Sequence, residues 1–405
     1  MSALDMNMNK FNILFLYSGA IAPLRGGIES VSNELAEYFT TKGCSCYYLS
    51  LNKNIISNKR EYYLSNSTCF YNVENKEYLI NFIKQKQINI LINQGGFDKD
   101  CSQLAYLVKA YGVKLISCIH NSLLDRIRNF DVSYYNKFKK KKLHFLLKYT
   151  RYKFVKNILY LMYYFKYQKH FKKLHKYSDS IILLSDSFKK DFSFFVVDIS
   201  DKISAIPNSI PSKIYESKSN DKKEKILLYV GRIDMQQKRP DLLLQIWSMI
   251  YKEYNDWKLC IVGGGKDLNY LKTYASTHHL ENVIFEGNQN PIPYYQKASI
   301  FCMTSSYEGF GIVLVEAMNM KLVPVAFESF STIRDIIDDD VNGILIPPFE
   351  KDLYAKKLSE LIRNDDLRYS LSNKAYQKSH QFRMDVIGDK WLTLFASLYG
   401  DTIVS

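Results

Sequence analysis

The chain has 405 residues and a net charge of +14, and 47% of its residues are hydrophobic. This length favours two domains with substantial cores, and the low Pro and Gly content argues against long disordered tracts. The charge favours an anionic partner: a nucleic acid, a membrane surface or a phosphorylated substrate. The seven cysteines are scattered without metal-ligand spacing, so we expect reduced core cysteines.

The first half of the chain alternates between strand-like and helix-like patterns. The apolar run 11–18 is expected to be a buried first strand rather than a signal peptide, and no run reaches the ~18 apolar residues that span a bilayer. Such alternation implies a parallel sheet covered by helices on both faces. We expect strands at 11–18, 44–51, 88–96 and 113–122, and helices at 26–43, 77–87 and 102–112.

The second half of the chain repeats the alternation after a polar, turn-rich stretch at 200–223. Strands are expected at 225–232, 257–265, 282–288, 299–306, 322–329 and 342–348. Helices are expected at 239–254, 267–280, 292–299, 312–320 and from 351 to about 399. We therefore predict an α/β protein with two Rossmann-like domains, 1–205 and 206–385, and a C-terminal helix, 386–405, that packs back on the first domain.

The most specific pattern is SSYEGFGIVLVEAM at 305–318. Glu308 and Glu316 flank a loop and the first turns of a helix, with Gly309 and Gly311 between them. Glycine lets backbone N–H groups approach a ligand closely, and a helix N-terminus attracts phosphate oxygens. A carboxylate accepts hydrogen bonds from a diol, so the two acids could hold the two ends of a nucleotide sugar.

This segment resembles the E-x7-E signature of the family 4 retaining glycosyltransferases, also called glycosyl transferases group 1, which include bacterial capsule, lipopolysaccharide and O-antigen sugar transferases. The resemblance extends over most of the chain. It implies the GT-B fold, in which two Rossmann-like domains face an interdomain cleft. It further implies that Glu316 binds the ribose, that Glu308 contacts the donor sugar, and that the backbone from Gly309 through Phe310, Gly311 and Ile312 lies on the sugar and diphosphate.

Two cations in YVGRIDMQQKRPDLLL (229–244) suit a diphosphate. Arg232 follows a strand and Lys238 precedes a helix, so both can stabilise a leaving nucleoside diphosphate without a metal. The family pattern has such an Arg and Lys in this role. Arg239 and Pro240 replace the Gly that usually follows the Lys, which could alter how the helix begins.

Two further candidates lie in the first half. Gly26 and Gly27 follow the first strand and resemble the glycine loop with which the family approaches the donor phosphate and the acceptor. His120 ends a predicted strand, where the family often places a histidine against the donor sugar. Without the other motifs, the glycines could equally form a plain strand-to-helix turn. A lone histidine is more often structural, but the place of His120 at the carboxyl end of a strand favours contact with a sugar.

No metal site is expected. VGGGKD (262–267) lacks the last glycine of a dinucleotide fingerprint and is interpreted as a strand-to-helix turn near the nucleotide. Asp338, Asp339 and Asp340 precede Val-Asn-Gly, which is typical of a surface turn. The only small molecule expected is therefore the nucleotide-sugar co-substrate. The resemblance implies front-face displacement without an enzymatic nucleophile.

A basic, aromatic stretch occupies 137–176, with 14 Lys and Arg and no Asp or Glu, which equals the net charge of the whole chain. Interleaved rings and lysines favour an interfacial helix on an anionic membrane. A solvated helix face and a nucleic-acid surface are the alternatives, the last disfavoured because no nucleic-acid-binding fold surrounds the stretch.

The sequence thus predicts a cytoplasmic enzyme at the inner face of the membrane. It would move a hexosyl unit, with retention and without metal, from a nucleotide sugar to a lipid-linked, lipopolysaccharide or polysaccharide acceptor. A UDP-sugar is the first choice of donor and GDP-mannose the second. The alternatives are a non-catalytic nucleotide- or membrane-binding relative and a sugar-nucleotide epimerase of the same fold.

Overall fold

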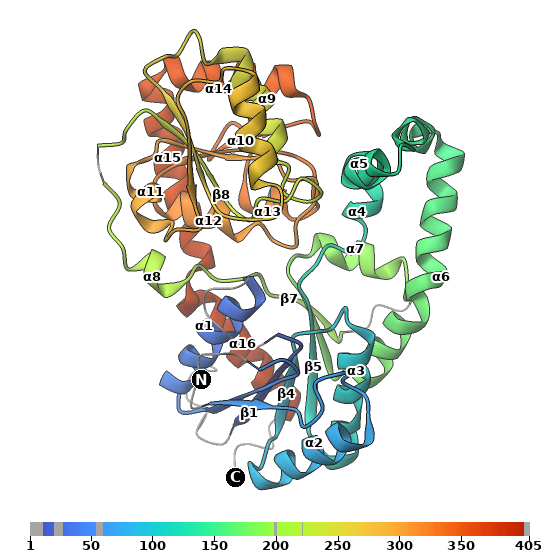
Figure 1. Ribbon diagram of the computed structural model, residues 1–405. Coiled ribbons are helices and arrows are strands. Elements are labelled where there is room, and N and C mark those ends of the chain that lie inside the picture. The colour runs from blue at the N-terminus through green and yellow to red at the C-terminus, as the bar shows by residue number, and fades with distance from the viewer. Residues whose placement is uncertain (1–10, 20–26, 54–59, 198–200, 221, 401–405) are drawn as a thin grey trace. The chain divides into compact units, whose positions relative to one another are not determined.

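The computed structural model describes residues 11–19, 27–53, 60–197, 201–220 and 222–400. The chain groups into two compact units (Figure 1). The first unit contains Met1–Asn121, Tyr163–Pro211 and Phe382–Ser405, and the second contains Ser122–Met162 and Ser212–Gln381.

The first unit is built on a parallel sheet whose described strands run in the order β3-β2-β1-β4-β5-β6-β7. Residues of β1 alternate between two cores, with Ile13 and Phe15 in one and Leu14 and Leu16 in the other. Helices therefore cover both faces, as expected for a sheet made of apolar runs. The strands are β1 (Asn12–Tyr17), β2 (Ser45–Ser50), β3 (Glu61–Tyr63), β4 (Ile90–Asn93), β5 (Lys114–Ile119), β6 (Ser180–Leu183) and β7 (Ile203–Ala205).

The helices of this unit include the C-terminal one. They are α1 (Gly27–Thr41), α2 (Val73–Gln85), α3 (Lys99–Ala105), the 3-10 helix at Tyr106–Tyr111, the second part of α6 (Lys153–Tyr177), α7 (Ser187–Ser193) and α16 (Met384–Tyr399). Figure 1 shows α16, in red, beside the blue α1. Gly388 makes this contact possible, since a Cβ there would lie 2.2 Å from the Tyr38 ring. Tyr38 also donates to Asp389 Oδ1 at 2.6 Å.

The second unit contains another parallel sheet, with described strands in the order β10-β9-β8-β11-β12-β13. Its core includes Trp247 of α9 and Tyr354 of α14, both fully buried. Replacing a buried Trp by Ala typically costs about 3–5 kcal/mol, so this core is a major source of stability. The strands are β8 (Ile226–Val230), β9 (Lys258–Val262), β10 (Val283–Gly287), β11 (Ile300–Met303), β12 (Val323–Phe327) and β13 (Ile344–Ile346).

The helices of the second unit come from two parts of the chain. From the first part come α4 (Asp125–Arg128), α5 (Phe130–Lys140), the 3-10 helix at His144–Arg151 and the start of α6. From the second part come α8 (Ser212–Tyr215), α9 (Pro240–Ile250), α10 (Leu268–Thr277), α11 (Ile292–Lys297), α12 (Ile312–Asn319), α13 (Ile333–Ile336), α14 (Lys351–Arg363) and α15 (Asp365–Ser379), followed by a short 3-10 helix at His380–Phe382.

The predicted α/β class with two parallel sheets is confirmed. The short strands β3, β6 and β7 were not predicted. The observed units end a few residues from the predicted limits of 205 and 385. They also assign 122–162 to the second unit, whereas the sequence placed all of 1–205, including the whole basic stretch 137–176, in the first domain.

Candidate functional site

Three loops of the second unit leave neighbouring strands at the same edge of the sheet. Strands β9, β8 and β11 are adjacent and parallel, so the loops after Val262, Val230 and Met303 start side by side. Ligands of parallel α/β sheets bind at this carboxyl edge. A Cβ on Gly263 would lie only 1.9 Å from the Gly231 carbonyl oxygen, so the first two loops touch backbone to backbone.

Lys238 and Glu308 form an ion pair at this edge, with Nζ and Oε1 2.7 Å apart. Ser305 donates a second hydrogen bond to the same oxygen at 2.6 Å. Glu308 is only 5% exposed, so burial and the lysine hold its carboxylate in one orientation. No described residue donates to Glu308 Oε2. One oxygen is thus fixed by the protein and the other is open to a ligand hydroxyl.

Glu316 lies on α12, where Tyr295 donates to its Oε2 at 2.8 Å. Burial raises the pKa of this carboxyl to about 7, while the Tyr295 hydrogen bond and the charge of Lys238 act in the opposite direction. Its Oε1 receives no hydrogen bond from the described residues. Glu316 therefore has the same arrangement as Glu308, with one oxygen held and one available.

Arg232 is placed more loosely. Its side chain is 61% exposed, donates to Gln237 Oε1 at 2.8 Å, and lies 3.9 Å from Asp234. Asp234 also accepts from the backbone N–H of Gln236 at 2.7 Å, which shapes the loop between Arg232 and Lys238. The loop is therefore ordered, while the guanidinium at its start stays accessible to an anion.

The turn before α12 is built as the glycine pattern suggested. Gly311 has a φ of 85°, a left-handed conformation that favours glycine, and immediately precedes the helix. A Cβ there would also lie 3.3 Å from the Phe330 ring. Gly309, Phe310 and Ile312 surround this turn, and the start of α12 directs N–H groups toward the same strand edge.

His120 and Gly27 lie in the first unit, and Gly26 lies outside the described residues. His120 Nε2 is 2.5 Å from Gln94 Oε1. Because burial lowers the pKa of His120 to about 4, the ring is neutral near pH 7. An amide oxygen can only accept, so Nε2 carries the proton and Nδ1, which is buried without a partner, is a free acceptor.

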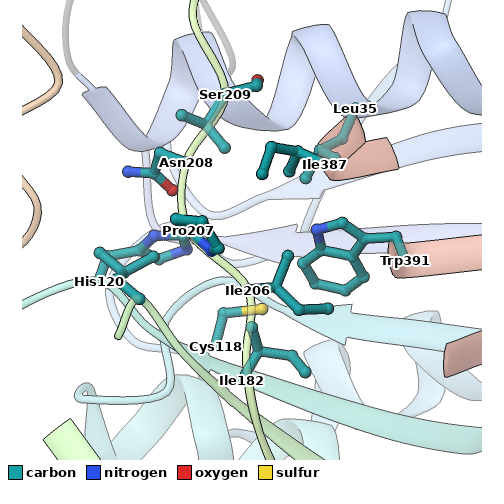
Figure 2. A pocket seen from close by; sticks show the side chains of 12 residues that line it. Leu35, Cys118, His120, Ile182, Ile206, Pro207, Asn208, Ser209, Ile387 and Trp391 are labelled. Carbon is teal, nitrogen blue, oxygen red and sulfur yellow. The ribbon is translucent and has the colours of Figure 1, made fainter. Parts of the chain in front are cut away.

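Gln94 follows β4 and was not identified from the sequence. It is 2% exposed, and its Nε2 is buried without a partner. Figure 2 shows His120 beside Pro207 and Asn208 in a narrow pocket that is closed on the other side by Trp391 and Ile387. Ser209, whose Oγ is also buried without a partner, lines this pocket. Unsatisfied buried polar atoms are uncommon, so these groups are candidates for contact with a polar ligand or a buried water.

A second feature absent from the sequence reasoning is the attachment of α4 to the loops after β11 and β12. Asp125, which is 1% exposed, accepts from the Ser331 backbone N–H at 2.9 Å and from its hydroxyl at 2.6 Å. Asn129 donates to the carbonyl oxygens of Ser306 and Ser329 at 2.7 and 2.6 Å. These bonds explain why residues 122–162 group with the second unit.

The predicted site residues of the second unit are thus brought together, with Lys238, Glu308 and Glu316 at one strand edge and Arg232 at the start of an adjoining loop. Within the described part of the chain, no group of three or more His, Cys, Asp or Glu side chains could hold a metal ion. Asp338 and Asp339 are used in a turn, where Asp339 accepts from the Leu345 N–H at 2.8 Å. No described helix is long and apolar enough to cross a bilayer.

The basic stretch forms α5, a 3-10 helix and the 25-residue helix α6. Phe154, Ile158, Leu161 and Phe165 follow one another at spacings of four, three and four residues, so they share one face of α6. Their side chains are 75%, 41%, 54% and 69% exposed. Farther along the helix, exposed lysines continue this face at 169, 172 and 176.

Residues 212–378 match the family model described as Glycosyl transferases group 1. Two curated relatives are the amylovoran biosynthesis glycosyltransferase AmsD of Erwinia amylovora and a Campylobacter jejuni α-1,4-N-acetyl-D-galactosaminyltransferase named for a diphospho-undecaprenol-linked glycan. The first is 33% identical over 172 residues, 42% of this chain and 48% of the relative. The second is 25% identical over 225 residues, 55% of this chain and 62% of the relative. The chain thus spans about half to three fifths of these relatives.

Similarity to solved structures extends over nearly the whole chain. The Anabaena protein HepE, solved in complex with UDP, aligns with a TM-score of 0.71 and 15% identity, covering 96% of this chain and 100% of that one. The fold is therefore that of the GT-B glycosyltransferases, as the sequence predicted. At 15% identity, this similarity supports the fold but assigns no role to individual residues.

Proposed function

We propose, on the premise that residues 212–378 belong to the family Glycosyl transferases group 1, that this chain is a retaining glycosyltransferase. It transfers a hexosyl unit from a UDP-sugar to a lipid-linked or polysaccharide acceptor and requires no metal. The observation that carries this proposal is the Lys238–Glu308 ion pair beside Glu316, in which each carboxylate keeps one oxygen open. The UDP in HepE and the diphospho-undecaprenol-linked glycan in the name of the Campylobacter jejuni relative support the choice of substrates.

The residues at the strand edge account for binding of the donor. Glu316 accepts from the ribose hydroxyls and Glu308 from hydroxyls of the transferred sugar. Lys238, Arg232 and the N–H groups at the start of α12 stabilise the diphosphate as its charge grows. Cations and backbone dipoles thereby take the part that a divalent metal has in other transferases.

The reaction follows as a front-face displacement. The bond between the sugar C1 and the diphosphate oxygen breaks, and the electron pair leaves with the nucleotide. The acceptor oxygen bonds to C1 on the same face, and its proton passes to the departing phosphate oxygen. The family resemblance implies a donor-sugar contact for His120, and its neutral ring is not assigned the part of a general base.

A ligand screen tests the donor class. In buffer containing EDTA, UDP and UDP-sugars are expected to raise the melting temperature of the protein, whereas GDP- and ADP-sugars raise it less. Hydrolysis or transfer of the stabilising donor then reports turnover. Absence of stabilisation by every nucleotide, with or without added Mg²⁺, would contradict the proposed function.

The acceptor is proposed to lie at an anionic membrane, which α6 contacts. Its exposed face is apolar over Phe154, Ile158, Leu161 and Phe165 and cationic beyond them, where Lys169 and Lys172 stand. Rings at the acyl boundary combined with lysines at the headgroups are typical of interfacial helices. A protein held there by α6 would be peripheral, at the cytoplasmic face where anionic lipids and nucleotide sugars are both present.

Removing the two most exposed rings of α6 tests this contact. The Phe154→Ser/Phe165→Ser variant is expected to bind anionic vesicles at least tenfold more weakly than the parent, since burying a Phe side chain contributes roughly 1.5–3 kcal/mol. Binding of the parent should also weaken with added salt. Tyr369→Ser, which removes an equally exposed ring from α15, is the matched control. Equal vesicle binding by the double variant and the parent would remove the membrane from the proposal.

A further inference from the structure

One cation of the second unit stands near Glu308 without an acidic partner. Arg126 lies in α4, and its guanidinium carbon is 4.7 Å from the centre of the Tyr134 ring and 5.9 Å from that of Tyr307. Its Nε is buried without a hydrogen-bond partner. Tyr307 immediately precedes Glu308 in the chain. An arginine that no family pattern singled out is therefore held next to the proposed donor site.

The other cations of this edge already have anionic neighbours. Lys238 is paired with Glu308 at 2.7 Å. Arg232 and Lys266 share Asp234, at 3.9 and 3.3 Å. Among the described residues, no carboxylate forms an ion pair with Arg126. Arg126 therefore has a positive charge that an anionic ligand at this strand edge could balance.

The local structure fixes Arg126 in this position. Asp125 and Asn129 on either side of it bond to the loops after β11 and β12. Arg128, in the same helix, donates to both Asp125 and Ser331 at 2.5 Å. The contacts of the Arg126 guanidinium with the Tyr134 and Tyr307 rings are cation–π contacts, which use none of its N–H donors. A guanidinium held against aromatic rings with its donors free is suited to bidentate binding of phosphate oxygens.

We propose that Arg126 binds diphosphate oxygens in the active site, an inference that rests on the proposed function. The shared chemistry is a diphosphate, which the nucleotide donor or a lipid-diphosphate acceptor can supply. Arg126 reaches the site from the segment that continues into the basic stretch, so it links the donor-binding edge to the part of the chain proposed to contact the membrane. It would act as a binding residue alongside Lys238 and Arg232.

Titration calorimetry of the full chain distinguishes the two sources. Arg126→Gln removes the charge, Arg126→Lys keeps the charge without the planar fork, and Arg363→Gln is the control, because Arg363 is also stacked on a tyrosine (5.7 Å from the centre of the Tyr254 ring) but lies on α14. If the donor supplies the diphosphate, Arg126→Gln weakens UDP binding roughly tenfold or more, and Arg126→Lys weakens it less. If the acceptor supplies it, UDP binding is unchanged, but inorganic pyrophosphate binds to the UDP-saturated parent and not to UDP-saturated Arg126→Gln.

The control and melting temperatures make the result decisive. Arg363→Gln should bind both probes as the parent does, and Arg126→Gln should melt within a few degrees of the parent. Unchanged affinity of Arg126→Gln for UDP, together with equal pyrophosphate binding by the two UDP-saturated proteins, would overturn the role of Arg126. A parent protein that binds no UDP would instead contradict the proposed function itself.

Discussion

Glu308→Gln is expected to reduce sugar transfer by roughly 10²–10³-fold, the range seen when one preorganised electrostatic contact is removed from an active site. The substitution preserves the shape of the side chain. It removes the charge that balances Lys238 at 2.7 Å and the carboxylate oxygen that would accept from the donor sugar. The loss should appear mainly in kcat, because the sugar contact strengthens as the bond to the leaving group breaks. Steady-state kinetics with the stabilising donor measure it.

Glu328→Gln is the matched control for this variant. Glu328 follows β12, is paired with Arg334 and is more exposed than Glu308, with 34% of its side chain accessible. It should retain the parent's kcat. Retention of more than half of the parent's kcat by Glu308→Gln would exclude Glu308 from the chemistry.

Glu316 should make the stability of the protein depend on pH. Its folded-state pKa of about 7 lies above the ordinary value of 4.5, so the folded protein binds an extra proton between these values. The contribution of protonated Glu316 to the free energy of unfolding is therefore complete below pH 4.5 and is lost as the pH rises through 7. A shift of this size corresponds to about 3 kcal/mol in the free energy of unfolding. Urea unfolding between pH 4.5 and 8 should show this decline in the parent and a flatter profile in Glu316→Gln.

The same titration has a consequence for binding. Ribose hydroxyls donate to the ionised carboxylate, so UDP affinity should increase as the pH rises from 6 to 8 in the parent and stay nearly constant in Glu316→Gln. Glu328→Gln should reproduce the parent's profile in both experiments. Parallel stability profiles for the parent and Glu316→Gln would show that this carboxyl titrates as an ordinary one.

The sequence was informative where the site is local. Glu308, Gly311 and Glu316 lie within nine consecutive positions, and the expected strand, turn and helix around them are present. Lys238 was assigned from its place before a helix, and the ion pair with Glu308 was beyond reach because 70 residues separate the two. Strand length and periodicity give the class of fold. They do not give side-chain partners.

The missed residues share a physical reason. Gln94 meets His120 because β4 and β5 are adjacent strands, and Asn129 meets Ser329 across 200 positions. Neither contact leaves a periodic or compositional signal. These features depend on tertiary placement, which one sequence does not encode in readable form.

The central claim is that Arg232, Lys238, Glu308 and Glu316 serve a single nucleotide diphosphate. A crystal structure of the protein with UDP, grown in EDTA, tests it most directly. We expect ribose hydroxyls within about 3.2 Å of Glu316 and phosphate oxygens within the same range of Lys238, Arg232 and the first N–H groups of α12. UDP bound away from these four residues, or bound only when a divalent metal is supplied, would contradict the account.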